Sequence, residues 1–103
     1  MLRHKYGAVR TELDGRRFDS RAEAHYYLTL KLRQTAGEVV QFLTQVPFVL
    51  PGGVRYVVDF LEFHADGSVH WIDVKGRDTQ ASKNKRKQVE ALYAPIKIEI
   101  VQC

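Results

Sequence analysis

The sequence predicts a single α/β domain with a mixed central sheet, helices packed on that sheet, and the element order α-β-β-β-α-β. Runs rich in β-branched and aromatic residues, which favour strands, recur at 39–50, 54–64, 68–76 and 95–103. Two segments of good helix formers with capping residues at their starts lie at 20–35 and 78–94. The chain has 103 residues, of which 45% are hydrophobic and 27% charged, so one domain with a modest core is expected.

The first helix is expected from about Ser20 to Thr35. Ser20 and Glu23 have the spacing of a capping box, and Gly37 is a natural stop. On this interpretation Glu23 serves the helix end and needs no other function. Residues 1–17 are basic and rich in turn-forming residues, so they are expected to form an arm with a short hairpin centred on LDGRRF. The domain itself is then expected to span residues 18–103.

The strands at 54–64 and 68–76 are expected to form a hairpin through the tight turn ADGS. Pro47 favours an edge position or a bulge for strand 39–50, because proline cannot donate a ladder hydrogen bond. The second helix is expected to begin at Thr79 or Ser82 and to end near Pro95. The last strand follows this helix, so it is expected to lie parallel to strand 68–76 after a right-handed crossover.

Two acids lie in apolar surroundings on this hairpin, Asp59 in YVVDF and Asp73 in WIDVKG. A three-residue loop at 65–67 would place Asp59 opposite Asp73, with Lys75 on the same face. A two-residue Asp66-Gly67 turn would shift the register and direct Asp59 to the other face. Because lone buried carboxylates are costly, the sequence favours the three-residue loop or a bulge.

Carboxylates that face each other repel, and a divalent cation with oxygen ligands would let Asp59 and Asp73 both stay ionised. Lys75 would then lie beside the metal, where it could hold or help deprotonate a bound water. Glu23 becomes a third acid there if the first helix packs across the face that bears Asp59. Structural alternatives exist: Asp59 could be satisfied by the backbone or by Arg55, and an acid-x-Lys match is expected about once by chance.

The joint pattern resembles the PD-(D/E)xK nuclease superfamily over residues 18–101. It is carried by Glu23 in SRAEAHYYL, by Asp59 in YVVDF, and by Asp73 and Lys75 in WIDVKG, in the same order of elements. The chain is similar to small phage and prophage nuclease-like proteins, and related members include Holliday-junction-resolvase-like enzymes and virus-type replication-repair nucleases. Residue 58 is Val, where the superfamily's name has Pro.

The resemblance implies a restriction-endonuclease-like fold and a metal-dependent endonuclease that acts on DNA in phage recombination, replication or repair. Asp59 and Asp73 would ligate Mg²⁺ or Mn²⁺ together with the backbone carbonyl of Val74. Glu23 would bind the metal directly or through water, and Lys75 would position or activate the attacking water.

Gln45 is a further candidate site residue, because a strand glutamine beside VPF could hydrogen-bond the water or a phosphate. It could equally be an exposed edge residue. The formal net charge is +4, and clustered basic residues are expected to contact DNA phosphates without reading sequence. These residues are Arg16, Arg17, Arg21, Lys83, Arg86 and Lys87.

The remaining sequence features concern the cellular compartment and the competing functions. The single cysteine, Cys103, leaves no internal disulfide, and no apolar run approaches the ~18 residues of a membrane span, so a cytoplasmic protein is expected. A non-catalytic nucleic-acid-binding module and a phage assembly protein are the competing functions. The form of the substrate, including RNA, stays open, as does a homodimer or a larger protein partner.

Overall fold

The computed structural model describes residues 11–102 as a small α/β domain with two helices and a mixed sheet, so the expected α/β class with a mixed sheet is confirmed. After an N-terminal hairpin the elements follow the expected order α-β-β-β-α-β. The elements are β1 (Thr11–Leu13), β2 (Arg16–Phe18), α1 (Arg21–Thr35), β3 (Val39–Val49), the 3₁₀ turn η1 (Pro51–Gly53), β4 (Arg55–His64), β5 (Val69–Lys75), α2 (Gln80–Leu92) and β6 (Ile98–Gln102).

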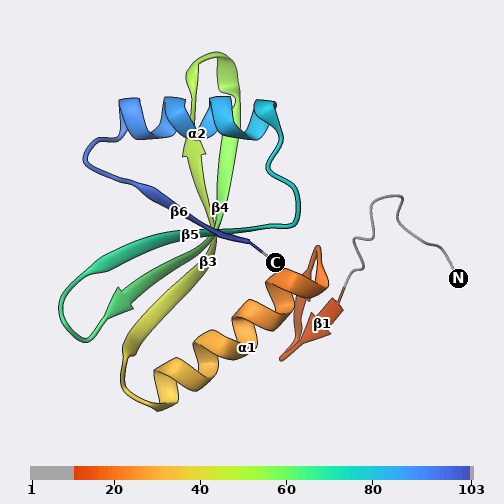
Figure 1. Ribbon diagram of the computed structural model, residues 1–103, viewed down its shortest axis with the longest axis vertical. Coiled ribbons are helices and arrows are strands. Elements are labelled where there is room, and N and C mark those ends of the chain that lie inside the picture. The colour runs from red at the N-terminus through yellow and green to blue at the C-terminus, as the bar shows by residue number, and fades with distance from the viewer. Residues whose placement is uncertain (1–10, 103) are drawn as a thin grey trace, which may run out of the picture.

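The main sheet has the strand order β3-β4-β5-β6. The first three strands are antiparallel neighbours, and β6 pairs in parallel with β5, as expected for a strand that follows a helix. β3 lies at the edge of the sheet, so the edge position inferred from Pro47 is confirmed. In Figure 1 the strands cross the middle of the molecule, with α2 towards the top and α1 towards the bottom.

Local sequence signals explain where the helices begin. Ser20 caps α1 and accepts a 3.1 Å hydrogen bond from the backbone N–H of Glu23, and Thr79 caps α2 in the same way. The expected LDGRRF hairpin is present as β1 and β2, joined by Asp14 and Gly15 with φ of 52° and 75°. The arm expected over the preceding residues lies largely outside the described part of the chain.

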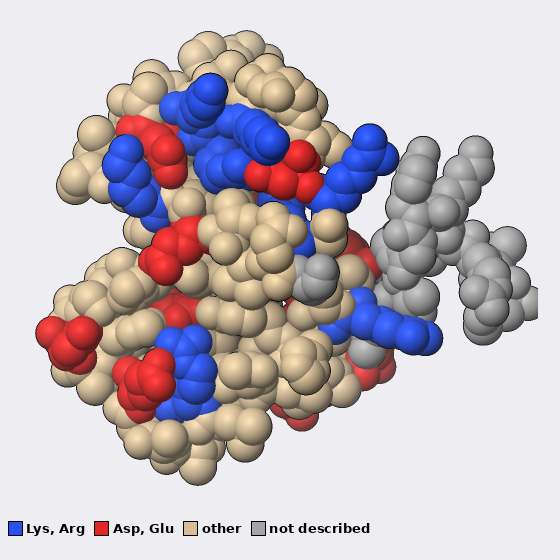
Figure 2. Space-filling view, viewed as in Figure 1, with Lys and Arg blue, Asp and Glu red and all other residues tan. Residues whose placement is uncertain are grey.

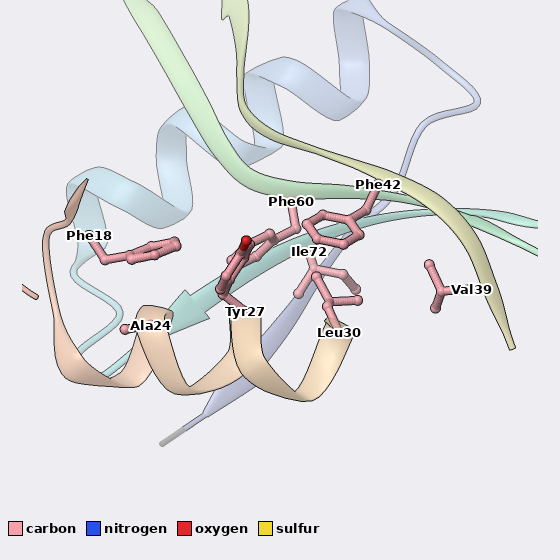
Figure 3. Packing of buried hydrophobic residues seen from close by; sticks show 8 residues of the cluster. All are labelled: Phe18, Ala24, Tyr27, Leu30, Val39, Phe42, Phe60 and Ile72. Atoms are coloured by element: carbon pink, nitrogen blue, oxygen red, sulfur yellow. The ribbon is translucent and has the colours of Figure 1, made fainter. Parts of the chain in front are cut away.

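Two hydrophobic clusters make up the interior. The first lies between α1 and the sheet, where Tyr27 and Leu30 of the helix point towards Phe60 and Ile72 (Figure 3). The second lies on the side of α2 and contains Phe48, Leu50, Tyr56, Val58, Val89 and Ile98. We call these the α1 core and the α2 core.

β3 and β4 contribute to both cores. Phe42 and Phe48 are six residues apart in β3, so a flat strand would direct both side chains to one face. Phe42 nevertheless packs in the α1 core and Phe48 in the α2 core, and Phe60 and Val58 of β4 divide in the same way. Gln45 lies between the two halves with a left-handed φ of 56°. The β3–β4 ribbon therefore turns over near Gln45 and serves both helices.

The β4–β5 hairpin has the three-residue loop that was predicted from the cost of burying lone carboxylates. Phe63 pairs with Val69 and Phe60 with Ile72, and the His64 N–H donates to the Ser68 carbonyl at 2.9 Å. This register makes Asp59 and Asp73 the next opposed residues. The regular pairing ends at Phe60 and Ile72, one step before these acids, so the strands separate where the acids lie.

Candidate functional site

The side chains of Asp59 and Asp73 bridge the gap where β4 and β5 separate. The Asp59 backbone N–H donates to Asp73 Oδ1 at 2.9 Å, and the Val74 N–H donates to Asp59 Oδ2 at 2.9 Å. Each carboxylate thus takes the place of a carbonyl of the interrupted ladder. The register of the hairpin agrees with the prediction, but Asp59 and Asp73 are not partners in the ladder, and the backbone of the opposite strand orients each carboxylate.

Asp73 is the more enclosed of the two aspartates, with 1% of its surface exposed. The Tyr56 hydroxyl donates to Asp73 Oδ2, and Lys75 Nζ lies 3.4 Å from the same oxygen. Lys75 also lies over the Tyr56 ring, 5.7 Å from its centroid, and its side chain is 22% exposed. Burial, followed by the hydrogen bond to Asp73, raises the pKa of Tyr56. Asp73 and Lys75 are therefore in contact, and the lysine reaches towards solvent.

Tyr56 is a site residue that sequence reasoning missed. Its hydroxyl holds the buried carboxylate of Asp73, although the two residues are not neighbours in the strand register. A tyrosine in a buried strand needs a partner for its hydroxyl, and this requirement was a usable signal. The partner could not be named from the sequence, because it depends on how β4 leaves β5.

Glu23 approaches the gap from the first turn of α1 and is 5% exposed. Its carboxylate oxygen Oε2 accepts a hydrogen bond from Gln45 Nε2 at 2.6 Å. A hydrogen bond from Gln45 also favours the ionised form of Asp59. The helix-capping interpretation holds for the Glu23 backbone, but its side chain belongs to the same cluster as Asp59. Gln45 is the link between these two acids.

The proton affinity of the cluster is high because the acids are buried together. Burial, aided by the negative charge of Asp59, raises the pKa of Glu23 to about 7. Burial also raises the pKa of Asp59 to about 6, with a further contribution from Asp73 and an opposing hydrogen bond from the Val74 N–H. A site that holds protons near neutral pH also offers hard oxygen donors to a divalent cation.

The described part of the chain holds no complete, preformed metal cage. Among residues 11–102, no group of three or more His, Cys, Asp or Glu side chains is arranged so that it could hold a metal ion. The expected ligands Asp59, Asp73 and Val74 are connected to one another, and Glu23 interacts with Asp59 and accepts a hydrogen bond from Gln45. These oxygen donors are of the kind that Mg²⁺ and Mn²⁺ prefer. To bind such an ion, the carboxylates of Asp59 and Asp73 would have to give up some of their hydrogen bonds to the backbone.

The predicted DNA-contacting residues fall into two groups. Figure 2 shows Lys and Arg side chains gathered over α2, where Lys83 and Lys87 are exposed. Arg86 on the same helix is only 14% exposed and forms a bidentate ion pair with Asp78, with distances of 2.6 and 3.1 Å. Arg86 therefore anchors α2 within the protein, unlike its exposed neighbours.

The second group lies around β2 and the start of α1. Arg17 and Arg21 are exposed. Arg16 is also exposed, but it donates to Thr44 Oγ1 at 2.9 Å and lies over the Tyr27 ring. These three arginines precede Glu23 in the chain, so their backbone positions keep positive charge near the helix end that carries the acid.

A further buried acid, Glu62, has no predicted role. It is 1% exposed and is held by Tyr26, by His64 at 2.8 Å and by Arg33 at 3.4 Å. These partners satisfy its charge at the end of the sheet near the α1 C-terminus. Glu62 is therefore explained as a structural ion-pair network.

A family model described as "Protein of unknown function (DUF1064)" matches residues 3–103 of the chain. No curated protein and no solved structure gives a significant match. No helix in the described part of the chain is long and apolar enough to cross a membrane.

Proposed function

The chain belongs to the DUF1064 family of proteins of unknown function, and we propose that it is a divalent-metal-dependent endonuclease that hydrolyses DNA phosphodiester bonds. The observation that carries the proposal is the pair Asp59 and Asp73 at the point where β4 and β5 separate, with Lys75 in contact with Asp73. Glu23 adds a third buried acid from α1. The resemblance of this residue pattern to the PD-(D/E)xK superfamily supports the same activity.

A purely structural ion pair does not account for the cluster. Three acids share the site, and the basic side chain that contacts an aspartate there is Lys75. The raised pKa values of Glu23 and Asp59 mean that the fold disfavours negative charge at this point, so that either a proton or a bound cation would relieve it. Acids buried together are costly to ionise, and binding a divalent cation is the simplest function that would use them.

The residues have distinct proposed roles. Asp59, Asp73 and Glu23 would hold Mg²⁺ or Mn²⁺ together with the Val74 carbonyl. A bound ion would supply a water of lowered pKa and polarise the phosphoryl oxygens. The Asp59 N–H and the Tyr56 hydroxyl orient Asp73, and Lys75 places a positive charge where negative charge develops on the phosphate. Gln45 holds Glu23 and Asp59 in one cluster.

The direct test is nicking of plasmid DNA, and cleavage of junction, flap, nicked and plain duplex DNA, with Mg²⁺ or Mn²⁺. Asp73→Asn and Lys75→Met are expected to lower cleavage by at least about 100-fold, the scale of lost charge stabilisation. Matched controls are Asp66→Asn in the exposed hairpin loop and Lys97→Met, both outside the cluster. The assignment fails if Asp73→Asn and Lys75→Met cut DNA as well as these controls do.

Metal binding has its own readout, independent of cutting. The unfolding temperature of the parent protein is expected to rise with Mn²⁺ or Mg²⁺ at pH 8, because a ligand that binds only the folded state stabilises it. Asp73→Asn is expected to lose most of that rise, and Asp66→Asn to keep it.

A non-catalytic DNA-binding module is the second candidate, favoured by the absence of a preformed metal cage among the described residues. This function predicts salt-sensitive DNA binding with no cleavage in any divalent metal and no rise in unfolding temperature. The two measurements above therefore separate the candidates.

A further inference from the structure

A largely apolar cavity of about 360 Å³ lies between the first turns of α1 and the carboxyl ends of β5 and β6. Figure 1 shows the end of β6 beside the start of α1. The volume falls within the roughly 300–1,000 Å³ of sites that bind small organic groups. The main lining residues are Arg21, Ala22, His25, Tyr26, Val74 and Val101.

The sequence brings apolar side chains from three elements to this cavity. Ala22, His25 and Tyr26 share one face of α1, because residues three and four apart lie together on a helix. Val74 and Val101 are partners in the parallel register of β5 and β6, so their side chains lie on one face of the sheet. Tyr26, Val74 and Val101 pack against the α1 core but are only partly buried. The α1 core therefore reaches the surface at this cavity.

Tyr26 gives the cavity a fixed aromatic wall. Its hydroxyl donates to Glu62 at 2.5 Å, and its ring packs on Phe60 with 5.2 Å between the ring centroids. Because the protein already holds the ring in place, a ligand that packs against Tyr26 does not have to order this side chain. Such a preformed ring is the usual platform on which an unpaired base stacks.

The polar residues at the cavity indicate a ligand that joins an apolar part to an anion. Arg21 and His25 are exposed, and none of the described residues that line the cavity is acidic. A guanidinium pairs with phosphate oxygens and also stacks on flat rings. The valines and Ala22 offer only apolar contact. A nucleotide of DNA has both parts, a base with apolar faces and a charged phosphate.

The cavity adjoins the acidic cluster through two chain neighbours. Ala22 precedes Glu23 in α1, and Val74 lies between Asp73 and Lys75 at the end of β5. β5 and β6 both end here, and in open α/β sheets ligands bind outside the carboxyl ends of the strands. A DNA strand with one phosphate at the acidic cluster can therefore reach the cavity with a neighbouring base.

We propose that this cavity binds an unpaired DNA base next to the phosphate to be cut, so that the preferred substrate is flapped, gapped or branched DNA. A paired base must leave its stack to enter such a cavity, whereas an unpaired base avoids most of that energetic cost. Tyr26 and His25 contact the base, and Arg21 contacts its phosphate. The position relative to the cut rests on the proposed function, whereas the base site itself rests on the cavity and its lining.

The first test measures DNA binding in EDTA, without cleavage, by fluorescence anisotropy of two labelled duplexes with a short single-stranded flap. One flap carries thymine bases, and the other has the same backbone with abasic sites. The parent protein is expected to bind the flap with bases about 10-fold more tightly, the scale of one stacked base. Equal affinity for the two flaps would overturn the proposal, as would a parent protein that binds no DNA.

Ala22→Leu fills part of the cavity and is expected to bring this base-to-abasic affinity ratio close to unity. Ala91→Leu makes the same change at an exposed position of α2 and is expected to keep the parent ratio. Because the ratio compares two DNAs on one variant, a general change in DNA affinity cancels. A parent ratio retained in folded Ala22→Leu would contradict the site.

His25 provides a second variant that does not disturb the interior, because its side chain is exposed. His25→Ala is expected to lower the base-to-abasic ratio by about fivefold, the lower end of the range for stacking on an aromatic ring. His25→Phe retains a ring and is expected to keep the ratio. The unfolding temperature is expected to be similar in both variants. A parent ratio in both His25→Ala and Ala22→Leu would overturn the proposal.

A second copy of the chain and a free nucleotide are the competing occupants. Sedimentation velocity tests the first: a dimer that dissociates in Ala22→Leu, with a base-to-abasic ratio near unity in the parent, would assign the cavity to a second copy. Micromolar binding of thymidine monophosphate, with the same ratio near unity, would assign it to a free nucleotide. Either result would overturn the proposal.

Cleavage assays separate this inference from the proposed nuclease. A protein that prefers the flap with bases in EDTA but cuts no DNA with Mg²⁺ or Mn²⁺ refutes the nuclease and keeps the base site. A protein that cuts both flaps and plain duplex equally well, and binds both flaps equally, refutes the base site and keeps the nuclease.

Discussion

At the scale of single residues, the buried carboxyls of Glu23 and Asp59 make the folded protein a stronger proton acceptor than the unfolded chain. The pKa of Glu23 is about 7 in the fold against 4.5 for an ordinary glutamate, and that of Asp59 is about 6 against 3.8. Between these values the folded state binds more protons than the unfolded state. Stability therefore decreases as the pH rises through this window.

Metal-free protein in EDTA is accordingly expected to lose roughly 2–4 kcal/mol of unfolding free energy between pH 5 and pH 8, from these two groups. Glu23→Gln removes one titrating group and relieves Asp59 of a neighbouring charge, so the decrease becomes shallower. Urea unfolding at both pH values measures the effect, with Glu12→Gln on β1 as the control. An equally steep decrease in Glu23→Gln would show that the burial of Glu23 is not the cause.

The acids themselves were predictable from the sequence, since Asp59 and Asp73 interrupt apolar strands where an ionised side chain needs a partner. The arrangement of Tyr56 and Gln45 was not. Gln45 adopts a left-handed backbone conformation that glutamine rarely takes, and Tyr56 reaches Asp73 only because the strands have separated. Both depend on tertiary packing that no local pattern encodes.

At the scale of elements, the three-residue loop of the β4–β5 hairpin sets the register of the site. Its last residue, Gly67, has a φ of 88° and donates to the His64 carbonyl at 3.0 Å. The sequence is compatible with a two-residue or a three-residue loop. The cost of burying lone carboxylates favours the three-residue loop, and the structure has this loop. The end of the β4–β5 ladder was not predictable, because carboxylates replace the carbonyls there.

Gly67→Ala is expected to destabilise the protein by about 1 kcal/mol or more, because residues with a Cβ avoid this φ. The cost arises from the backbone alone, since a Cβ at this position would meet no atom within 4 Å. Urea unfolding measures it, and the neighbouring exposed Ala65→Gly is the control. A variant as stable as the parent would indicate that the loop has another accessible conformation.

At the scale of the whole molecule, the positive charge over α2 divides into exposed and internal parts. Lys83 and Lys87 face solvent, whereas Arg86 pairs with Asp78. From the sequence, all three residues were predicted to contact DNA phosphates, because they are positively charged and lie close together on one helix. Their difference comes from Asp78, which precedes the helix and lies within reach of Arg86.

Lys83→Gln with Lys87→Gln is expected to reduce the salt slope of DNA binding by about one to two, in proportion to the number of phosphates that the two lysines neutralise, with unchanged stability. Arg86→Gln is expected to lower the unfolding free energy, because it leaves Asp78 without its partner, and to leave the salt slope unaltered. Anisotropy titrations and urea unfolding on the same samples separate the two effects. A slope change in Arg86→Gln as large as in the lysine variant would contradict this division.

The turning over of the β3–β4 ribbon has a consequence for when the candidate site forms during folding. The acidic cluster lies where the ribbon passes from the α1 core to the α2 core, with Glu23 supported by one core and Tyr56 by the other. A nascent or partly folded chain that has assembled only one core therefore lacks a complete site. For the nuclease proposed above, cleavage of DNA would therefore require the finished fold, with both cores assembled.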